Sequence, residues 1–328
     1  MEKSILKKFT FLNLIVSLIF IGGCGTVKVP VKVTHPAEIN MTQYKQIAIS
    51  DIKGNMGQEF SDGLKSRLIE CGRFKVVDRN RMNQIMRELK LSQSDLSDSG
   101  NTIKLGKLMS ASALIAGHTE GNYKETRSRK RRKCYKDKKE YSCTTYYRKG
   151  IFSTSGSIDV IDVQTGEIIR SKVLNARYNK STSATDATPP SIDKGSLARA
   201  ANSDNLEKFV KAITPWNEMV MVPFKTDGNI PDLERGVNMA KIGELNEAVK
   251  IFQFAAKAAE GNAKIKPKSI AKAYWNLGLA YEYSYNYDNA VVAFKKAYAL
   301  DPKDEFSKEI KNAKKLKAEK KKLDEQNN

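Results

Sequence analysis

The sequence predicts an α/β domain followed by an all-α helical module. Between residues 44 and 213, short apolar runs typical of strands alternate with longer runs whose apolar positions recur at helical spacing. In the last third, small and aromatic residues recur at helical spacing. Ahead of both regions, a short leader carries basic residues and then an apolar run that ends at Cys24. We therefore expect a processed leader and two domains in the remaining chain.

The leader has the order of features of a secretory signal. Three lysines and one glutamate precede the apolar segment 9–21, which is short for a membrane span of about 20 residues. Gly22, Gly23 and Cys24 follow, and this order resembles the lipobox of bacterial lipoproteins. The resemblance implies a signal peptide over 1–23, diacylglycerol and an N-acyl lipid on Cys24, and no other cofactor. The alternative is a plain signal peptide, or a short anchor helix with a chance cysteine.

After a polar, extended tether over 24–43, the α/β domain over 44–213 begins. Three runs predict strands: "YKQIAISDI" at 44–52, "RFKVVD" at 73–78 and "SALIAGHTEG" at 112–121. Helices are expected over 58–71, over 79–91 and, as a short segment, over 102–109. Gly72 can end the first helix in a left-handed conformation, and Asp78 can cap the second. "GSIDVIDVQTGEIIRSKVL" then predicts two strands joined by a tight turn at Thr165-Gly166.

These residues resemble the core of the CsgG family, which includes the curli secretion lipoprotein. The resemblance is carried by the block from Gly72 to Leu91, by Leu105-Gly106, and by the strand that ends at Gly117. It covers 44–175 and extends toward 213. It implies a three-layer α/β domain that is similar in fold to LpoB, a lipoprotein activator of a peptidoglycan synthase. Because the matched residues serve the core and the turns, the resemblance specifies the fold and not an activity.

Two segments of the domain differ from the secretion pores of that family. Pore-forming members contribute transmembrane hairpins, whose strands of about 9–11 residues alternate apolar and polar side chains. Here the corresponding segments are a basic insertion over 122–150 and a Ser/Thr/Ala-rich segment over 177–206. Charged side chains that face lipid cost about 2–4 kcal/mol each at the middle of the bilayer. We therefore do not expect these segments to form a pore.

The charge of the chain is concentrated in two places. The chain has 57 basic and 37 acidic residues, and nine basic residues with one acidic residue lie between 127 and 139. A second basic run covers 308–322. An exported lipoprotein has little access to nucleic acid, so we expect this excursion from the sheet to bind an anionic surface. The alternative is a solvated, flexible loop. The residues expected to bind are Arg129, Lys130, Arg131, Arg132 and Lys133.

The cysteines have separate expected roles. Cys134 and Cys143 flank a short polar stretch, and in an oxidising compartment their pairing as a disulfide is expected. Their spacing does not resemble a metal site, and the two histidines are far from both, so no metal is expected. Two free thiols are the alternative. Cys71, at the end of the first helix, is expected to be a small buried residue.

The module over 229–322 resembles tetratricopeptide repeats. "AKAYWNLGLAYEYSYNYDNAVVAFKKAYALDP", residues 271–302, has the small and aromatic residues of one repeat, and a weaker copy with Gly236 and Phe252 lies 42 residues earlier. Two repeats are fewer than the three that are generally needed, so the helix from about 303 to 322 should cap them or the repeats should dock on the first domain. A generic helical hairpin bundle is the alternative. The residues expected to form the scaffold for partner binding are Tyr274, Leu277, Gly278, Tyr281, Ala290 and Phe294.

No catalytic residues are expected. The sequence has no P-loop, no Gly-rich dinucleotide turn and no Gly-x-Ser-x-Gly elbow, and it has only two histidines. We expect a non-enzymatic envelope lipoprotein, anchored in the outer membrane and facing the periplasm. It would act as a scaffold or adaptor whose helical module binds another envelope protein. Two alternatives are a ring-forming secretion component of the curli type, which would be a homo-oligomer, and an LpoB-like activator of a cell-wall synthase.

Overall fold

The computed structural model describes residues 25–50, 52–77 and 112–327, with a few isolated positions between 87 and 104. The expected signal peptide and Cys24 lie outside the described residues, as do most of the helices expected over 79–91 and 102–109. The chain divides into two compact units. One contains the chain up to Val33 together with Glu218–Ala318, and the other contains Thr34–Asn217 together with Glu319–Asn328. An α/β region followed by a helical region is the fold class that the sequence predicts.

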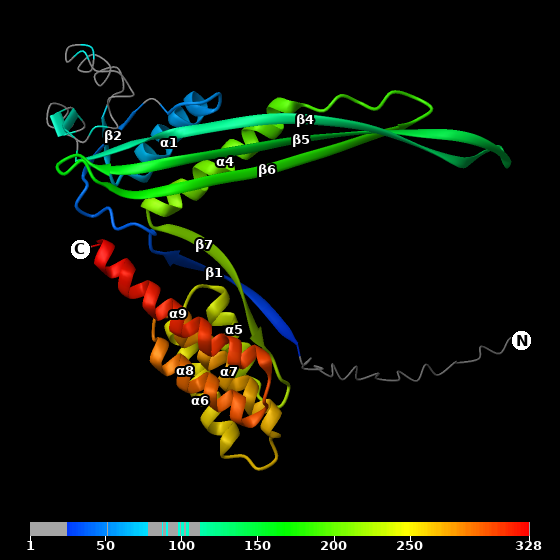
Figure 1. The fold of residues 1–328 in the computed structure, drawn as a ribbon. Helices are drawn as coiled ribbons and strands as arrows, with labels where there is room; N and C mark the ends of the chain where they lie inside the picture. Colours follow the sequence, from blue (N-terminus) through cyan, green and yellow to red (C-terminus); the bar gives the residue numbers. More distant parts are fainter. Residues whose placement is uncertain are drawn as a thin grey trace, which may run out of the picture. The chain divides into compact units, whose positions relative to one another are not determined.

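The Thr34–Asn217 unit is built on a sheet in which the described strands lie in the order β3-β2-β4-β5-β6. Short β2 pairs in parallel with β3 and β4, while β4, β5 and β6 are antiparallel neighbours (Figure 1). The elements of this unit are β2 (Gln46–Ile49), α1 (Gly57–Cys71), β3 (Lys75–Val77), β4 (Ala113–Lys136), β5 (Lys139–Asp162), β6 (Ile168–Thr185) and α4 (Lys194–Ile213).

Helices α1 and α4 cover the same face of this sheet. On α1, the buried residues Phe60, Leu64 and Leu68 recur every four residues, so they form one apolar stripe. Phe60 meets Phe209 of α4 edge to face, with ring centroids 6.2 Å apart. Both helices share one core with the strands. The further helices expected in 78–111 lie mostly outside the described residues, so the three-layer arrangement stays a prediction.

The end of α1 agrees with the prediction for Gly72 and contradicts the one for Cys71. Gly72 has φ 65°, and its N–H donates to the Ile69 carbonyl at 3.1 Å. Cys71 is exposed, with its sulfur 3.1 Å from the Leu68 carbonyl oxygen. The prediction of a buried Cys71 was wrong because this residue occupies the last turn of the helix. The apolar stripe has ended at Leu68, and no described element covers Cys71.

The basic insertion is not a loop. Strands β4 and β5 are 24 residues each and pair from Ala113↔Asp162 to Lys136↔Lys139, so they run through the whole of 122–150. Asp137 (φ 51°) and Lys138 (φ 64°) form the two-residue turn, as in a type I′ hairpin. In the second segment, β6 continues to Thr185 and α4 begins at Lys194. The alternative of a flexible loop is therefore wrong, because β5 provides backbone hydrogen-bond partners along the whole of β4.

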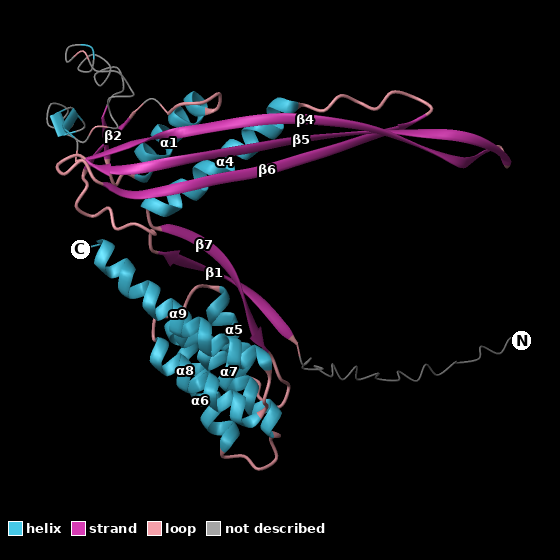
Figure 2. Ribbon diagram, in the orientation of Figure 1, coloured by secondary structure: helices cyan, strands magenta, loops and turns pink. Residues whose placement is uncertain are grey.

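The other unit combines a strand pair with helices. Strand β1 lies in the expected tether, pairs with β7, and contributes Val29 and Val31 to the core. The helices gather into one bundle (Figure 2). The elements are β1 (Thr26–His35), β7 (Trp216–Lys225), α5 (Asp232–Lys241), α6 (Leu245–Glu260), α7 (Pro267–Tyr283), α8 (Tyr287–Leu300) and α9 (Asp304–Asn327).

Candidate functional site

One face of α7 is covered by the chain itself. Trp275 is 2% exposed, its indole N–H donates to the Pro223 carbonyl at 2.9 Å, and its ring centroid is 5.0 Å from that of Phe306. Asn276 accepts from the backbone N–H of Lys225 at 2.8 Å and donates to its carbonyl at 2.7 Å. Strand β7 and helix α9 therefore occupy the face of α7 that carries Trp275 and Asn276.

The opposite face of α7 lines a groove that is open to solvent. The groove has a volume of about 170 Å³ and lies between α6 and α8, with α7 as its floor. Tyr274, Leu277 and Tyr281 recur at helical spacing on α7, which places them on one side of that helix. The residues that line the groove, which we call the α6–α8 groove, are Gln253, Lys257, Tyr274, Leu277, Tyr281, Asn289, Val292, Ala293 and Lys296.

The charges of the α6–α8 groove come from two lysines. The Nζ atom of Lys296 donates to the Tyr274 hydroxyl at 3.2 Å and lies 4.8 Å from the centre of that ring. It is also 3.8 Å from Glu260 Oε1. Burial raises the pKa of Tyr274, and the nearby Glu260 raises it further, so this phenol stays protonated. The groove thus offers aromatic surface, a phenol and ammonium groups, which suit an acidic, partly apolar peptide.

The structure separates the residues that the sequence grouped as a scaffold for partner binding. Tyr274, Leu277 and Tyr281 line the α6–α8 groove, whereas the other three join helix to helix. A Cβ atom on Gly278 would lie 2.5 Å from the ring of Phe294, and Ala290 is fully buried. The sequence prediction missed the residues that α6 and α8 contribute. For α6, the sequence does contain an indication: Gln253 and Lys257 are four residues apart and therefore lie on one face of the helix.

The earlier repeat has the same helix contact. A Cβ atom on Gly236 of α5 would lie 2.3 Å from the ring of Phe252 on α6, as Gly278 of α7 does with Phe294 on α8 at 2.5 Å. Each glycine precedes its phenylalanine by the same interval in the sequence. The two copies detected by sequence therefore pack in the same way. In each, the phenylalanine ring of the second helix lies against the glycine of the first helix, where there is no side chain.

A buried acid lies on the covered face of α7. Glu282 is 1% exposed, and its Oε1 accepts from Asn312 Nδ2 of α9 at 2.9 Å. Burial raises the pKa of Glu282 to about 9, and the neighbouring carboxylate of Glu309 contributes to the increase. The carboxyl group is therefore neutral at pH 7, which removes the cost of burying a charge next to α9.

The five basic residues of the expected anionic-surface site lie on β4 and are all exposed. Because side chains alternate along a strand, Arg129, Arg131 and Lys133 share one face of the ribbon, while Lys130 and Arg132 lie on the other. Lys133 pairs with Glu140 at 2.8 Å. The structure therefore divides this predicted site between two faces rather than gathering it on one.

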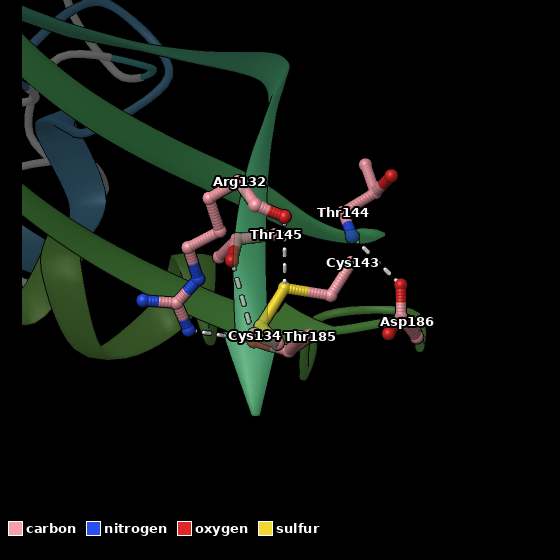
Figure 3. The surroundings of a disulfide bond; sticks show 7 residues. All are labelled: Arg132, Cys134, Cys143, Thr144, Thr145, Thr185 and Asp186. Atoms are coloured by element: carbon pink, nitrogen blue, oxygen red, sulfur yellow. Dashed lines mark hydrogen bonds between the residues drawn. A yellow bond between two sulfur atoms is a disulfide. The ribbon is translucent and has the colours of Figure 1, made fainter. Parts of the chain in front are cut away.

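Cys134 and Cys143 lie near the tip of the same hairpin. Their Cα atoms are 5.8 Å apart, and their sulfur atoms are joined in Figure 3. Cys143 is opposite Arg132 in the strand register. Nearby, the Thr144 N–H donates to Asp186 Oδ1 at 2.7 Å, which ties the end of β6 to β5 (Figure 3).

Two features are absent from the described residues. No group of three or more His, Cys, Asp or Glu side chains that could hold a metal ion occurs there. Within the same part of the chain, no helix combines the length and the apolar character needed to cross a membrane.

Comparison with known families identifies both regions. Residues 26–129 match the family described as curli production assembly/transport component CsgG, and residues 271–304 match the tetratricopeptide repeat. The chain thus carries a CsgG-like domain and a tetratricopeptide repeat, as the sequence predicts. The CsgG match begins earlier than the expected 44 and includes β1, and it ends at 129, before the expected 175.

Among solved structures, the chain is similar to the following three proteins at low identity. The LpoB C-terminal domain from Escherichia coli is 17% identical, with a TM-score of 0.27, and the match covers 40% of this chain and 82% of that one. Lipoprotein GNA1162 from Neisseria meningitidis is 9% identical, with a TM-score of 0.29, covering 48% and 94%. The PelC dodecamer from Paraburkholderia phytofirmans is 12% identical, with a TM-score of 0.26, covering 57% and 99%. At these TM-scores the three likenesses carry no argument about this chain.

Proposed function

We propose that this chain is a non-enzymatic envelope lipoprotein that acts as a scaffold, with a CsgG-like domain and a tetratricopeptide module that binds a protein partner. The observation that carries the proposal is the α6–α8 groove. Its floor is the face of α7 that carries Tyr274, Leu277 and Tyr281, its walls come from two further helices, and it combines tyrosines with lysines. Tetratricopeptide helices are typical of protein–protein recognition, and no enzyme activity is proposed.

The face of α7 that β7 and α9 cover is not the proposed binding face. Trp275, Asn276 and Glu282 on that face are already hydrogen-bonded to other parts of the same unit. A partner that used this face would have to displace β7 or α9 and leave these buried polar groups without partners, which is costly. The α6–α8 groove requires no such displacement.

Photo-crosslinking in intact envelopes tests the proposal. A photoreactive amino acid at Val292, which lines the groove and is 55% exposed, should capture a discrete protein partner. The same group at Tyr298, which is 43% exposed on the same helix but does not line the groove, is the matched control. Capture at Val292 should also decrease when Lys257 and Lys296 are changed to Glu. Equal capture at both positions would contradict the proposal.

A second candidate is a curli-type, ring-forming secretion component of the outer membrane. The observation that favours it is the family description that residues 26–129 match. The mass of the purified mature protein in detergent separates the candidates, because a ring is required for the secretion role and a monomer agrees with a scaffold. We propose the lipid anchor at Cys24 for both. Activation of a peptidoglycan synthase remains a third proposal, tested by adding the protein to the purified synthase.

A further inference from the structure

A cavity of about 530 Å³ lies beside the middle of the β4–β5 hairpin, within the Thr34–Asn217 unit. Its volume falls within the range of about 300–1,000 Å³ that is usual for small-molecule sites. The residues that line it come from β4, from β5 and from the segment after β6: Arg127, Ser128, Tyr146, Tyr147, Arg148, Asp186, Ala187, Thr188 and Pro189.

Two guanidinium groups share one wall of the cavity. Arg127 and Arg148 are register partners on β4 and β5, so their side chains lie on the same face of the sheet, together with Tyr146 two residues from Arg148. Arg127 Nε donates to Glu125 Oε1 at 3.0 Å, and this guanidinium lowers the pKa of the Glu125 carboxyl. Glu125 therefore stays ionised and holds the guanidinium groups of Arg127 and Arg148 at this wall.

Arg148 is mostly buried at this wall, and its Nε group makes no hydrogen bond to the described residues. Its side chain is 13% exposed, and its Nε lies 3.6 Å from Glu125 Oε1, which is too long for a hydrogen bond. That buried Nε has no hydrogen-bond partner among the described residues. A buried donor without an acceptor costs free energy, and an oxyanion in the cavity would meet the part of the Arg148 guanidinium that lines it.

The opposite wall is tied to the sheet at both ends. Asp186 has φ 52°, its N–H donates to the Thr144 carbonyl at 2.8 Å, and its Oδ1 accepts from the Thr144 N–H at 2.7 Å (Figure 3). Four residues later, the Pro190 carbonyl accepts from the Thr182 hydroxyl at 2.7 Å. The wall is therefore formed before any ligand arrives, which lowers the entropic cost of binding.

We propose that this cavity binds an acidic saccharide, in which a sugar ring carries a carboxylate. The guanidinium groups match a carboxylate with two parallel hydrogen bonds. The ring of Tyr146 and the Pro189 side chain offer apolar surface for the C–H face of the sugar. The Asp186 carboxylate and the Thr188 hydroxyl can bond the sugar hydroxyls. A neutral sugar offers the guanidinium groups no carboxylate beyond that of Glu125, and a phospholipid headgroup that is a simple phosphodiester has no ring face to offer.

Titration calorimetry on the purified full-length protein in detergent tests the proposal, with the disaccharide of galacturonic acid as the probe. Saturable binding of this probe, and no binding of neutral lactose, is expected. Arg148→Gln and Arg148→Lys should each weaken binding at least tenfold, because both remove the planar fork. Arg127→Gln, at a side chain that is 72% exposed, should weaken binding severalfold without affecting the fold. Arg177→Gln is the matched control, since Arg177 is exposed on β6 and does not line the cavity.

Four results would overturn the proposal. They are the absence of saturable binding up to millimolar probe, equal binding of lactose, unchanged binding in both Arg127→Gln and Arg148→Lys, and an equal loss in Arg177→Gln. Binding of phosphatidylglycerol vesicles should be measured as well. If these vesicles bind with the same dependence on Arg127 and Arg148 while the disaccharide does not bind, the site recognises lipid phosphate and the saccharide proposal fails. If Arg148→Gln does not fold, Arg127→Gln carries the test.

Discussion

Gly278 shows how a single missing side chain sets the geometry of a helix pair. Because a Cβ atom there would lie 2.5 Å from the Phe294 ring, Gly278→Ala forces the ring or the helix to move. We expect it to lower the free energy of unfolding by about 1–3 kcal/mol. Gly261→Ala is the control, because its Cβ would meet no atom closer than 3.7 Å. Urea denaturation measures both, and equal effects would contradict the packing argument.

The raised pKa of Glu282 should make the stability of the protein depend on pH. Its folded-state pKa of about 9 is raised above the ordinary value of 4.5 by burial and by Glu309, so the folded state holds a proton that the unfolded state releases. As far as Glu282 determines it, the free energy of unfolding is therefore highest below about pH 4.5. It falls as the pH rises and levels off above about pH 9. The slope in this window should be about 1 kcal/mol per pH unit.

The variant Glu282→Gln should remove this slope and raise the free energy of unfolding at pH 8, because a neutral amide keeps the acceptor for Asn312. Urea denaturation at pH 5, 6, 7 and 8 measures it for both proteins. Other groups titrate in the same range, so the quantity to compare is the difference between the two proteins. A difference that does not change with pH would refute the assignment of a protonated Glu282.

At the scale of elements, the β4–β5 hairpin should depend on a disulfide. Bonding Cys134 to Cys143 closes a short loop and should stabilise the hairpin by about 2–3 kcal/mol in the chain-entropy model. With thiol alkylation of the unreduced protein, Cys71 is the internal control because it is exposed and free. Mass spectrometry should find Cys71 alkylated and the other two unmodified. Alkylation of all three without reductant would rule out the disulfide.

We expect the two faces of the same hairpin to contribute differently to membrane binding. A flat anionic surface contacts one face of a ribbon, and the face of Arg129 and Arg131 also carries Arg127. Changing Arg129 and Arg131 to Gln should therefore weaken binding to phosphatidylglycerol vesicles more than changing Lys130 and Arg132 to Gln. Both effects should fade as salt rises from 20 to 300 mM, because the Debye length shortens. Vesicle co-sedimentation measures binding, and no effect from either pair would identify the ribbon as solvated surface.

At the scale of the whole molecule, the proposed lipid at Cys24 predicts where the protein resides. Several acyl chains, at about 0.8 kcal/mol for each buried methylene, would hold the protein nearly permanently. Cys24→Ala should leave the chain uncleaved or release it in soluble form. Fractionation of envelopes, with the size of the band reporting cleavage, measures this. A cleaved Cys24→Ala chain that stays fully in the membrane fraction would contradict the lipid assignment.

Sequence alone determined the features that depend on local residue order. The α1 stripe of Phe60, Leu64 and Leu68, the left-handed stop at Gly72 and the paired glycine and phenylalanine positions of the helical module all follow from spacing. Such patterns can be read without a structure because the residues involved are close in sequence, or repeat, so their periodicity reports the face they occupy.

Tertiary structure alone decided which faces are open. On α7, β7 and α9 cover the face that carries Trp275, while the face that carries Tyr281 lines a groove. This difference depends on segments that are far apart in the sequence. Likewise, the basic run over 127–139 lies in a strand pair because β5 is beside β4 and satisfies its backbone hydrogen bonds. Arg127 and Arg148 meet in one cavity only through that strand register, and long-range pairing of this kind leaves no local periodicity in the sequence from which it could be predicted.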